Sequence, residues 1–359
     1  MNDSKSSSKT AFQAELLKNR LVKRHKHLQN WVNRCGVGVY RLYDRDIPEI
    51  PLVLDFYTEV FSGSNAVSGA LFKRPYYKDY AEEALWIDAM KVSIAGALQI
   101  DLANIFVKIR QRLRTTDSND SSAEHGRTQY TKTQSSTTQT MDIKEGAFTF
   151  RVNLSDYIDT GLFPDLRKAR SYIQEVSHNK MVLNLFCYTG TFSVYAAAGG
   201  AARIDSLDMS KTYLEWAKTN FILNGFSKPH LHNSNCHFIR ADAIRFLDDA
   251  INKNYLWDII ILDPPSFSNS KKMLYNSLNG SLDIQRDYIT LLNKSLKVLR
   301  TKGQLLFCVN SHSFKFSNDD FNQYCKTEFP NIIIKDRTEM FRDEDFKEKR
   351  MPLCKVITL

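Results

Sequence analysis

The sequence predicts an α/β protein, in which a sheet with helices on both faces follows a small α+β domain and a basic N-terminal helix. After residue 148, apolar strands alternate regularly with amphipathic helices, a pattern typical of parallel sheets with crossover connections. Before that residue, the strands are fewer and one helix separates them. The chain has 359 residues, enough for two folded units.

The N-terminus predicts a polar tail followed by a basic helix. Met1–Thr10 is rich in Ser and Lys and lacks the apolar centre of a signal peptide, so we expect residues 1–10 to be disordered. Residues 11–36 predict a basic amphipathic helix, because apolar side chains recur at helical spacing between Lys and Arg. The apolar positions are Phe12, Leu16, Leu17, Leu21, Leu28 and Trp31.

Charge and composition favour a polyanionic partner and exclude a membrane span. Met1–Cys35 holds eight Lys or Arg against two acids, which supplies most of the net charge of +9. This asymmetry favours a nucleic acid, although basic helices that bind nothing are common. No run of about 18 apolar residues occurs, so we expect a cytoplasmic protein with no membrane contact. The six cysteines show no CxxC spacing, so we expect no metal and reduced thiols.

Three further segments complete the predicted organisation. Residues 37–114 predict a small α+β accessory or RNA-binding domain, with short strands within Val37–Val60 and near Asn104–Arg110 and a helix over Tyr80–Leu98. Residues 115–142 contain 13 Ser or Thr in 28 positions, which indicates a flexible loop. Residues 143–359 then form the larger α/β domain.

In the larger domain, the sequence predicts alternating strands and helices, because each apolar run is followed by a segment with helical periodicity. The expected strands are Met181–Phe186, Arg203–Leu207, Cys236–Arg240, Trp257–Leu262, Gln304–Val309, and segments near Ile332–Lys335 and Lys355–Thr358. The expected helices are Gly190–Ala198, Lys211–Asn224, Ala243–Asn252, Ile284–Leu299 and Asp319–Phe329. Ligands on such sheets bind at the carboxyl ends of the strands.

A glycine or an acid follows each of the first three of these strands. Gly190 lies in the turn after the first strand, where it would let the backbone approach a ligand. Asp208 follows the second strand, at the distance where an acid accepts hydrogen bonds from a ribose, and Asp242 follows the third. The turn lacks the G-x-G-x-x-G spacing of a dinucleotide site, which favours a nucleoside without a pyrophosphate, such as S-adenosylmethionine.

The fourth strand ends in Asp263-Pro264-Pro265-Ser266-Phe267. Two consecutive prolines with fixed φ predict a rigid exit from a buried strand. Such an exit would hold the acid and the following aromatic ring beside the cofactor.

These motifs resemble those of the RlmK family, which methylates N7 of a guanine in 23S ribosomal RNA. The resemblance is carried by Asn184-Leu-Phe-Cys-Tyr-Thr-Gly190, Asp208–Trp216 and Asp263–Lys271, and extends to Asp159–Arg167 and Tyr40–Asp46. It covers nearly the whole chain and implies a Rossmann-like class I methyltransferase sheet with S-adenosylmethionine as cofactor. Leu166 and Pro164 depart from the family's pattern, where a histidine and an apolar residue are expected.

The resemblance implies roles for individual residues. Asp208 should hold the cofactor ribose, Asp242 the adenine amino group, and the Asn184–Gly190 turn the methionine end, with Asp165 bordering the cofactor or RNA site. The full set expected to bind the cofactor is Arg167, Asn184, Phe186, Tyr188, Thr189, Gly190, Asp208, Met209, Asp242, Ala243 and Asp263. The expected catalytic set is Asp263, Pro264, Pro265 and Phe267, with Phe267 stacking on an extruded base. The residues expected to bind RNA are Lys18, Arg20, Lys23, Arg24, Lys26, Lys271 and Lys272.

The methylated atom is predicted from the absence of an aligned thiol. Methylating C5 of cytosine needs a cysteine thiolate beside the cofactor, and the similar RlmI-type enzymes carry it after the fifth strand. Asn310 aligns with that position here, and Cys308 lies two residues earlier. Guanine N7 already carries a lone pair, so positioning supplies most of its reactivity. Cytosine methylation using Cys308 stays open as an alternative.

Two further alternatives belong to other classes: a nicotinamide-dependent oxidoreductase, and an RNA-binding protein that keeps an inactive methyltransferase fold. The fused RlmKL enzymes carry an additional N2-guanine methyltransferase half. We therefore expect ribosomal RNA as the partner, and expect the chain to act either alone or with a separate N2-guanine methyltransferase.

Overall fold

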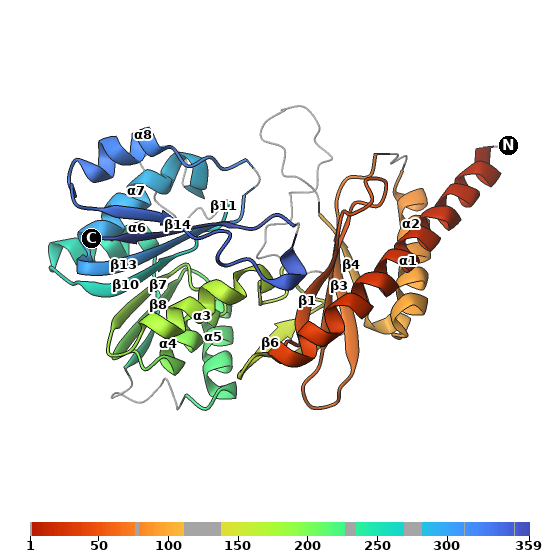
Figure 1. The fold of residues 1–359 in the computed structure, drawn as a ribbon, viewed down its shortest axis with the longest axis horizontal. Helices are drawn as coiled ribbons and strands as arrows, with labels where there is room; N and C mark the ends of the chain where they lie inside the picture. Colours follow the sequence, from red (N-terminus) through yellow and green to blue (C-terminus); the bar gives the residue numbers. More distant parts are fainter. Residues whose placement is uncertain are drawn as a thin grey trace. The chain divides into compact units, whose positions relative to one another are not determined.

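The computed structural model describes residues 2–75, 79–110, 138–226, 235–268, 282–311, 313–347 and 349–359, with side chains from residue 8 onward and without those of residues 267 and 268. The chain divides into an N-terminal unit, Met1–Pro164, and a C-terminal unit, Asp165–Leu359 (Figure 1). Within the described ranges, none of the helices combines the length and the hydropathy that a membrane span requires.

The N-terminal unit is built on a four-stranded sheet of order β1-β2-β3-β4. Its strands are β1 (Val39–Asp44), β2 (Leu52–Thr58), β3 (Asn65–Leu71) and β4 (Ile105–Ile109). The β3–β4 pair is parallel, and the other two pairs are antiparallel. Helix α2 (Tyr80–Leu98) and the short 3₁₀ helix η1 (Leu102–Asn104) form the crossover between β3 and β4. Strand β3 falls outside the strand segments predicted from the sequence.

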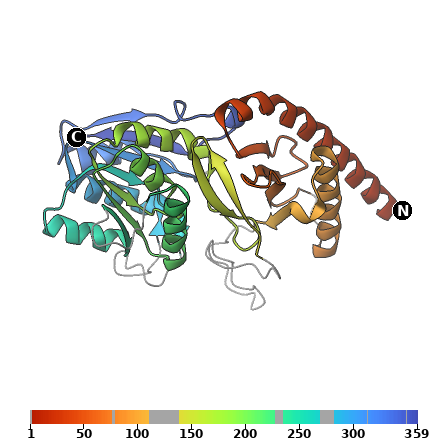
Figure 2. The same cartoon turned by 90° about the horizontal axis from the view of Figure 1, so that it is seen from below.

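Helix α1 (Asn2–Cys35) lies beside α2 (Figures 1 and 2). Leu17, Leu21 and Leu28 on its apolar face are fully buried, as the sequence pattern predicts. Gln13 and Trp86 join the two helices through an Nε1–Oε1 hydrogen bond of 2.8 Å. The expectation of disorder over residues 1–10 is corrected from Asn2 onward, because a helix already fixed by packing extends at little further cost.

A hairpin of β5 (Thr140–Glu145) and β6 (Phe148–Asn153) also belongs to the N-terminal unit. It joins the rest of that unit through isolated bridges from Val37 to Glu145 and from Glu59 to Ile143. The expected boundaries at residues 142 and 143 are therefore corrected: the flexible segment expected over 115–142 ends before Thr140, and the larger unit begins at Asp165. Residues 111–137 lie outside the described residues.

The C-terminal unit contains a seven-stranded sheet of order β14-β15-β13-β10-β7-β8-β9. Its strands are β7 (Met181–Leu185), β8 (Arg203–Asp208), β9 (Cys236–Arg240), β10 (Trp257–Leu262), β13 (Leu299–Val309), β14 (Ile333–Asp336) and β15 (Leu353–Thr358). In this sheet β15 runs opposite to the other six strands. The two-stranded pair β11 (Phe267–Ser268) and β12 (Leu282–Asp283) follows β10.

Helices cover both faces of this sheet, as predicted (Figure 1). One group is α3 (Arg167–Val176), α4 (Thr191–Ala198) and α5 (Lys211–Leu223), and the other is α6 (Ala243–Asn252), α7 (Ile284–Lys297) and α8 (Asn318–Phe321). The α8 helix continues as a π-helical turn, η3 (Asn322–Lys326), so the helix expected over Asp319–Phe329 is shorter and irregular. Helix α3 and the 3₁₀ turns η2 (Pro164–Leu166) and η4 (Glu344–Phe346) were not among the predicted elements.

The order of the strands reverses between β7 and β10, which lie next to each other at the centre of the sheet. Such a switch point opens a crevice at the carboxyl ends of the two strands, where α/β sheets bind their ligands. Asp208 ends β8 at this edge, and the other predicted site residues follow strands there: Gly190, Asp242 and Asp263.

Candidate active site

The turn after β7 has an unusual backbone. Phe186, Tyr188 and Gly190 all have positive φ, of 57°, 51° and 72°. The Cys187 N–H donates to the Leu207 carbonyl at 2.9 Å, and the Gly190 N–H donates to the Cys187 carbonyl at 2.8 Å. Phe186 and Tyr188 are strained in this left-handed conformation, which persists only where surrounding contacts hold it, as at ligand-binding turns.

The packing of helix α5 requires a glycine at position 190, for a reason that the sequence pattern does not reveal. A Cβ at this position would lie 2.7 Å from Cβ of Ala217 in α5, and its φ favours glycine. The expected reason was a close approach to a ligand. The structure shows a close approach to helix α5, and the approach to a ligand stays a prediction.

Asp208 is tied to this turn. Its carboxylate accepts hydrogen bonds from the Tyr188 N–H at 3.0 Å and from the Ser210 N–H at 2.8 Å. Burial raises the pKa of Asp208 to about 6, although these backbone hydrogen bonds act in the opposite direction. The acid predicted to bind ribose is thus fixed in place and ionised above about pH 6.

Asp242 caps helix α6. Its Oδ1 accepts a hydrogen bond from the Arg245 N–H at 3.1 Å. Its Oδ2 is buried and has no hydrogen-bond partner among the described residues. An unsatisfied buried acceptor is expensive and calls for a partner. This oxygen is therefore available to an N–H group of a ligand.

Four of the expected cofactor residues support the turn and the strand ends around it. Asn184 is buried and its Nδ2 donates to Ser193 Oγ at 2.8 Å, while the Thr189 carbonyl accepts a hydrogen bond from Asn220 at 2.8 Å. Asn220 was missed from the sequence, because it lies inside helix α5 and not at a strand end. Phe186 and Met209 are partly buried against the core of the unit.

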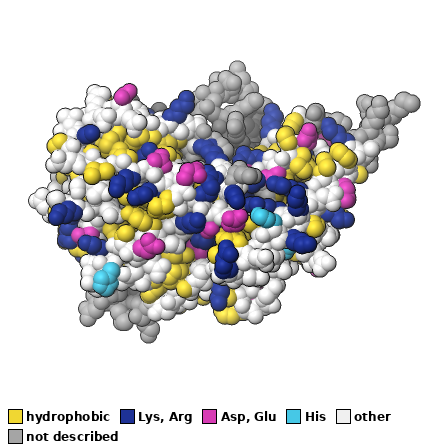
Figure 3. All heavy atoms as spheres, in the orientation of Figure 1, with side chains coloured by type: hydrophobic (Ala, Val, Ile, Leu, Met, Phe, Trp, Pro, Cys, Tyr) yellow, Lys and Arg dark blue, Asp and Glu magenta, His cyan; other side chains and the backbone are white. Residues whose placement is uncertain are grey.

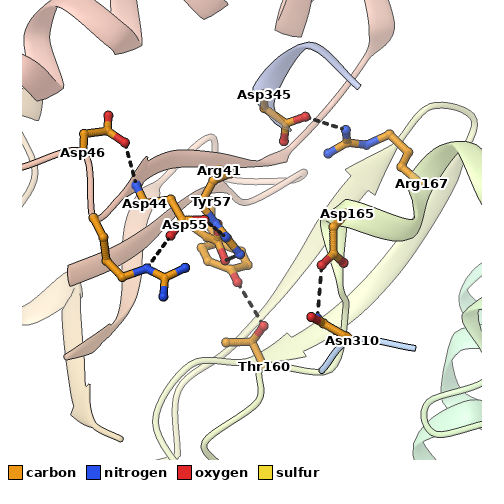
Figure 4. A network of polar contacts seen from close by, with 11 residues as sticks. Arg41, Asp44, Asp46, Asp55, Tyr57, Thr160, Asp165, Arg167, Asn310 and Asp345 are labelled. Atoms are coloured by element: carbon orange, nitrogen blue, oxygen red, sulfur yellow. Dashed lines mark hydrogen bonds and ion pairs between the residues drawn. The ribbon is translucent and has the colours of Figure 1, made fainter. Parts of the chain in front are cut away.

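The remaining expected cofactor residues differ in surroundings. Tyr188 packs edge-on against Tyr213 with a centroid distance of 4.5 Å, and Ala243 is buried at the start of α6. Arg167 is buried and forms ion pairs with Asp343 at 2.8 Å and Asp345 at 3.2 Å. These bonds fix the start of α3 against the segment that contains η4 (Figure 4).

The Asp263-Pro264-Pro265 segment continues β10 at the switch point. Asp263 is partly buried. Burial and the charge of Asp165 raise its pKa to about 7, although the charge of Arg170 acts in the opposite direction. Ser266 Oγ donates to the Asn310 carbonyl at 3.1 Å, so this segment is joined to the end of β13. The backbone of Phe267 lies in β11, and the stacking expected of its side chain lies outside the described residues.

The two residues that depart from the family's pattern, Pro164 and Leu166, lie beside this site. Pro164 opens η2, and Leu166 is buried there. Asp165 between them accepts a hydrogen bond from Nδ2 of Asn310 at 3.3 Å (Figure 4). The sequence did not reveal this contact, since 145 positions separate the two residues. Arg170, fully buried in α3, was missed as well.

Cys308 is not positioned as a nucleophile. It is fully buried in β13, and its Sγ lies 3.4 Å from Sγ of Cys354 in the neighbouring β15. The contact with the Cys354 thiol and burial raise the pKa of Cys308 well above its usual value. A buried thiol in this environment stays protonated and inert. The structure therefore argues against the cytosine alternative, which depends on Cys308.

The basic residues of α1 fall into two groups. Lys18, Lys23 and Lys26 are exposed, whereas Arg24 is partly buried and Arg20 forms an ion pair with Asp46 at 2.7 Å. Lys271 and Lys272 lie outside the described residues. Figure 3 shows Lys and Arg side chains spread over its face of both units rather than gathered in one patch. No group of three or more His, Cys, Asp or Glu in the described ranges could hold a metal ion.

The strand order and the acids at its switch point define a class I methyltransferase fold. A family model of the S-adenosylmethionine-dependent methyltransferases matches residues 124–344. Ribosomal RNA large subunit methyltransferase K of Neisseria meningitidis serogroup B is 37% identical over 336 residues, or 94% of this chain and 85% of that protein. The chain belongs to the family of these S-adenosylmethionine-dependent methyltransferases, which is the relationship that the motifs indicated and which excludes a nicotinamide-dependent oxidoreductase.

Other relatives are longer. Ribosomal RNA large subunit methyltransferase K/L of Methylococcus capsulatus is 37% identical over 347 residues, or 96% of this chain but only 42% of that protein. The chain thus spans less than half the length of such relatives. Among solved structures, a proposed methyltransferase complexed with SAH has the same fold, with a TM-score of 0.68 at 20% identity over 96% of this chain and 82% of that one.

The residues at this edge fit the cofactor of the family. Asp242 offers a buried oxygen that lacks a partner in the described part of the chain, as an adenine amino group requires. Asp208 presents a carboxylate already oriented by two backbone N–H groups. When bound, S-adenosylmethionine supplies an activated methyl group on its sulfonium.

Proposed function

We propose that this chain methylates N7 of a guanine in large-subunit (23S) ribosomal RNA, in the cytoplasm with the ribosome. The names of the K and K/L relatives support the RNA substrate. The observation that carries the choice of atom is the position of Cys308, which faces Cys354 inside the sheet. A carbon nucleophile on a pyrimidine needs a thiolate at the site, whereas the lone pair of guanine N7 needs only alignment with the methyl group.

In this proposal, Asp263 acts electrostatically. Transfer of a methyl cation to N7 leaves the guanine ring positively charged. A carboxylate that accepts a hydrogen bond from the 2-amino group of the guanine favours this charge as it develops. Pro264 and Pro265 hold the acid at the strand end and leave no proline N–H to compete for it. Asp208 and Asp242 hold the cofactor's ribose and adenine.

The proposal is tested by nucleoside mass spectrometry of ribosomal RNA from a strain that lacks the gene. We expect 7-methylguanosine to be lost from large-subunit RNA and restored when the purified protein and S-adenosylmethionine are added to that RNA. An inactive RNA-binding protein would restore nothing. A chain that restores 5-methylcytosine instead would overturn the choice of atom.

Replacing Cys308 by serine is expected to leave activity within about threefold of wild type, because a buried, protonated thiol takes no part in the chemistry. A second measurement uses RNA that contains 5-fluorocytosine, which traps enzymes that attack cytosine covalently. We expect no covalent adduct with wild-type protein. A trapped adduct that disappears in Cys308→Ser would restore the cytosine alternative.

RNA binding is proposed for the N-terminal unit, through the exposed lysines of α1 and the small domain expected over residues 37–114. Changing Lys18, Lys23 and Lys26 together to alanine should weaken binding equally for all RNA sequences. It should also reduce the slope of log affinity against log salt by about 2 to 3, since each phosphate contact contributes close to one. Filter binding over a salt series measures this slope.

A matched control removes three exposed lysines of the C-terminal unit, Lys180, Lys253 and Lys335. This variant has the same net charge as the α1 variant. If both variants lower the slope equally, net charge rather than α1 determines the binding.

A separate N2-guanine methyltransferase partner is a further part of the proposal. It rests on the resemblance to the fused RlmKL enzymes. We expect an N2-guanine methyltransferase to co-purify with the tagged protein. If none co-purifies and the 7-methylguanosine yield is complete without one, the chain acts alone.

A further inference from the structure

A buried carboxylate and an exposed amide face each other at the carboxyl ends of β10 and β13. Asp165 is buried, with 8% of its surface exposed, and its Oδ2 accepts the hydrogen bond from Asn310 Nδ2 at 3.3 Å. Asn310 is exposed directly after β13. Figure 4 shows the two side chains pointing toward each other, from the turn before α3 and from the strand end.

Hydrogen bonds restrain both the side chain and the main chain of Asn310. Ser266, in the segment that follows Asp263, donates to the main-chain carbonyl of Asn310 at 3.1 Å. The charge of Asp165 raises the pKa of Asp263, so Asp263 lies close enough to the Asp165–Asn310 pair to interact with it electrostatically. The amide is thus fixed beside the acid that we assign to the methylated base.

The carboxylate determines which way the amide faces. An ionised carboxylate accepts hydrogen bonds and donates none, so the nitrogen of Asn310, and not its oxygen, must face Asp165. The structure gives the Asn310 side chain no other hydrogen-bond partner among the described residues. One N–H and Oδ1 therefore stay available to a ligand, as a donor and an acceptor on one amide plane.

This orientation of the Asn310 amide is complementary to the Watson–Crick edge of guanine and not to that of adenine. The Watson–Crick edge of guanine presents the acceptor O6 beside the donor N1–H, which pairs with an amide N–H and an amide oxygen. Adenine presents a donor and an acceptor in the reverse order at the same two positions. An amide could pair with adenine only by turning over, which would place Oδ1 against the carboxylate of Asp165. N7 lies outside this edge and stays free.

We propose that Asn310 is a specificity-determining residue that reads O6 and N1–H of the target guanine, and that Asp165 is the positioning residue that prevents its amide from turning toward adenine-like bases. This inference rests on the proposed function and extends it from the methylated atom to the selection of the base.

The test compares two bases at one position of a synthetic RNA hairpin. The methylated guanine is first mapped with wild-type protein, and it is then replaced by 2,6-diaminopurine. This base keeps N7 and the 2-amino group and reverses only the edge that Asn310 would read. We expect wild-type protein to prefer guanine by about 100-fold in kcat/KM, since a bidentate contact of this kind discriminates about 10- to 100-fold and the wrong edge adds repulsion.

Two variants distinguish recognition of the base by Asn310 from a purely structural role of the Asp165–Asn310 pair. Asn310→Ala should lower kcat/KM for guanine by about 10- to 100-fold and leave 2,6-diaminopurine nearly unchanged, so that the preference collapses. Asp165→Asn should raise the rate on 2,6-diaminopurine relative to guanine at least about tenfold, because an amide at this position accepts either orientation of Asn310. Replacing the exposed Asn310 leaves the core intact, so this variant keeps the test decisive even if Asp165→Asn folds poorly.

Asn293→Ala is the matched control. Asn293 in α7 also donates its amide to a carboxylate, that of Glu328, at 3.0 Å, and it has no place in the site. Its replacement should leave the base preference unchanged, and all the variants should bind S-adenosylmethionine as wild type does. An equal loss on both bases in Asn310→Ala, or an unchanged preference in Asp165→Asn, would overturn this inference while the proposed function stands. If wild-type protein forms no 7-methylguanosine at all, both are wrong.

Discussion

Replacing Asp263 by alanine is expected to lower kcat for methyl transfer by about 10²- to 10³-fold while binding of S-adenosylmethionine stays close to that of wild type. The loss has this size because one preorganised group that faces developing charge contributes about that much in enzymes. Single-turnover methylation of ribosomal RNA measures the effect. Asp258→Asn, at the opposite end of the same strand, is the control and should stay active. Full activity of Asp263→Ala would refute the electrostatic role.

The pH dependence of the same residue gives a second readout. Because burial and Asp165 raise the pKa of Asp263 from 3.8 to about 7, the ionised form gains population as pH rises through 7, and kcat should rise with it to a plateau. Stability should change in the opposite direction. Between pH 3.8 and 7 the folded state holds a proton that the unfolded state has lost, so the free energy of unfolding falls as pH rises. Asp263→Asn should remove both effects.

Replacing Asp208 by alanine is expected to raise the Kd for S-adenosylmethionine by about 100-fold. The variant would lose the charge-assisted hydrogen bonds between the carboxylate and the ribose, each worth roughly 1.5 to 3 kcal/mol. It would also lose the hydrogen bonds that the carboxylate accepts from the N–H groups of Tyr188 and Ser210. Isothermal calorimetry measures this Kd. In wild-type protein the affinity should weaken below about pH 6, where Asp208 takes up a proton.

Asp205→Asn is the matched control, since Asp205 lies on the same strand and accepts hydrogen bonds from Trp257 and His237 instead. Its melting temperature should fall, but its Kd for S-adenosylmethionine should change by less than about threefold in the folded protein. A Kd that is the same in Asp208→Ala and in wild type would remove Asp208 from the cofactor site.

Much of the C-terminal unit could be predicted from the sequence. Strands such as Trp257–Leu262 are short apolar runs, and helices such as Ala243–Asn252 show a strong 3.6-residue period, so local patterns define both. The acids of the site could be predicted for the same reason. Each lies at the end of a strand or within two residues of it, and parallel strands bring their carboxyl ends to one edge of the sheet. The hairpin of β5 and β6 was missed because neither strand is strongly apolar and its bridges lead back to residues 37 and 59.

The sequence by itself determined the class of fold, the strand-end acids at Asp208, Asp242 and Asp263, and the family. The tertiary structure alone decided that Cys308 faces Cys354, that Arg167 pairs with Asp343 and Asp345, and that Asp165 meets Asn310. The physical reason is the range of the interactions. Hydrophobic periodicity records which face of a strand is buried, but the partner on that face belongs to another strand, and the pairing of strands is fixed only when the whole sheet assembles.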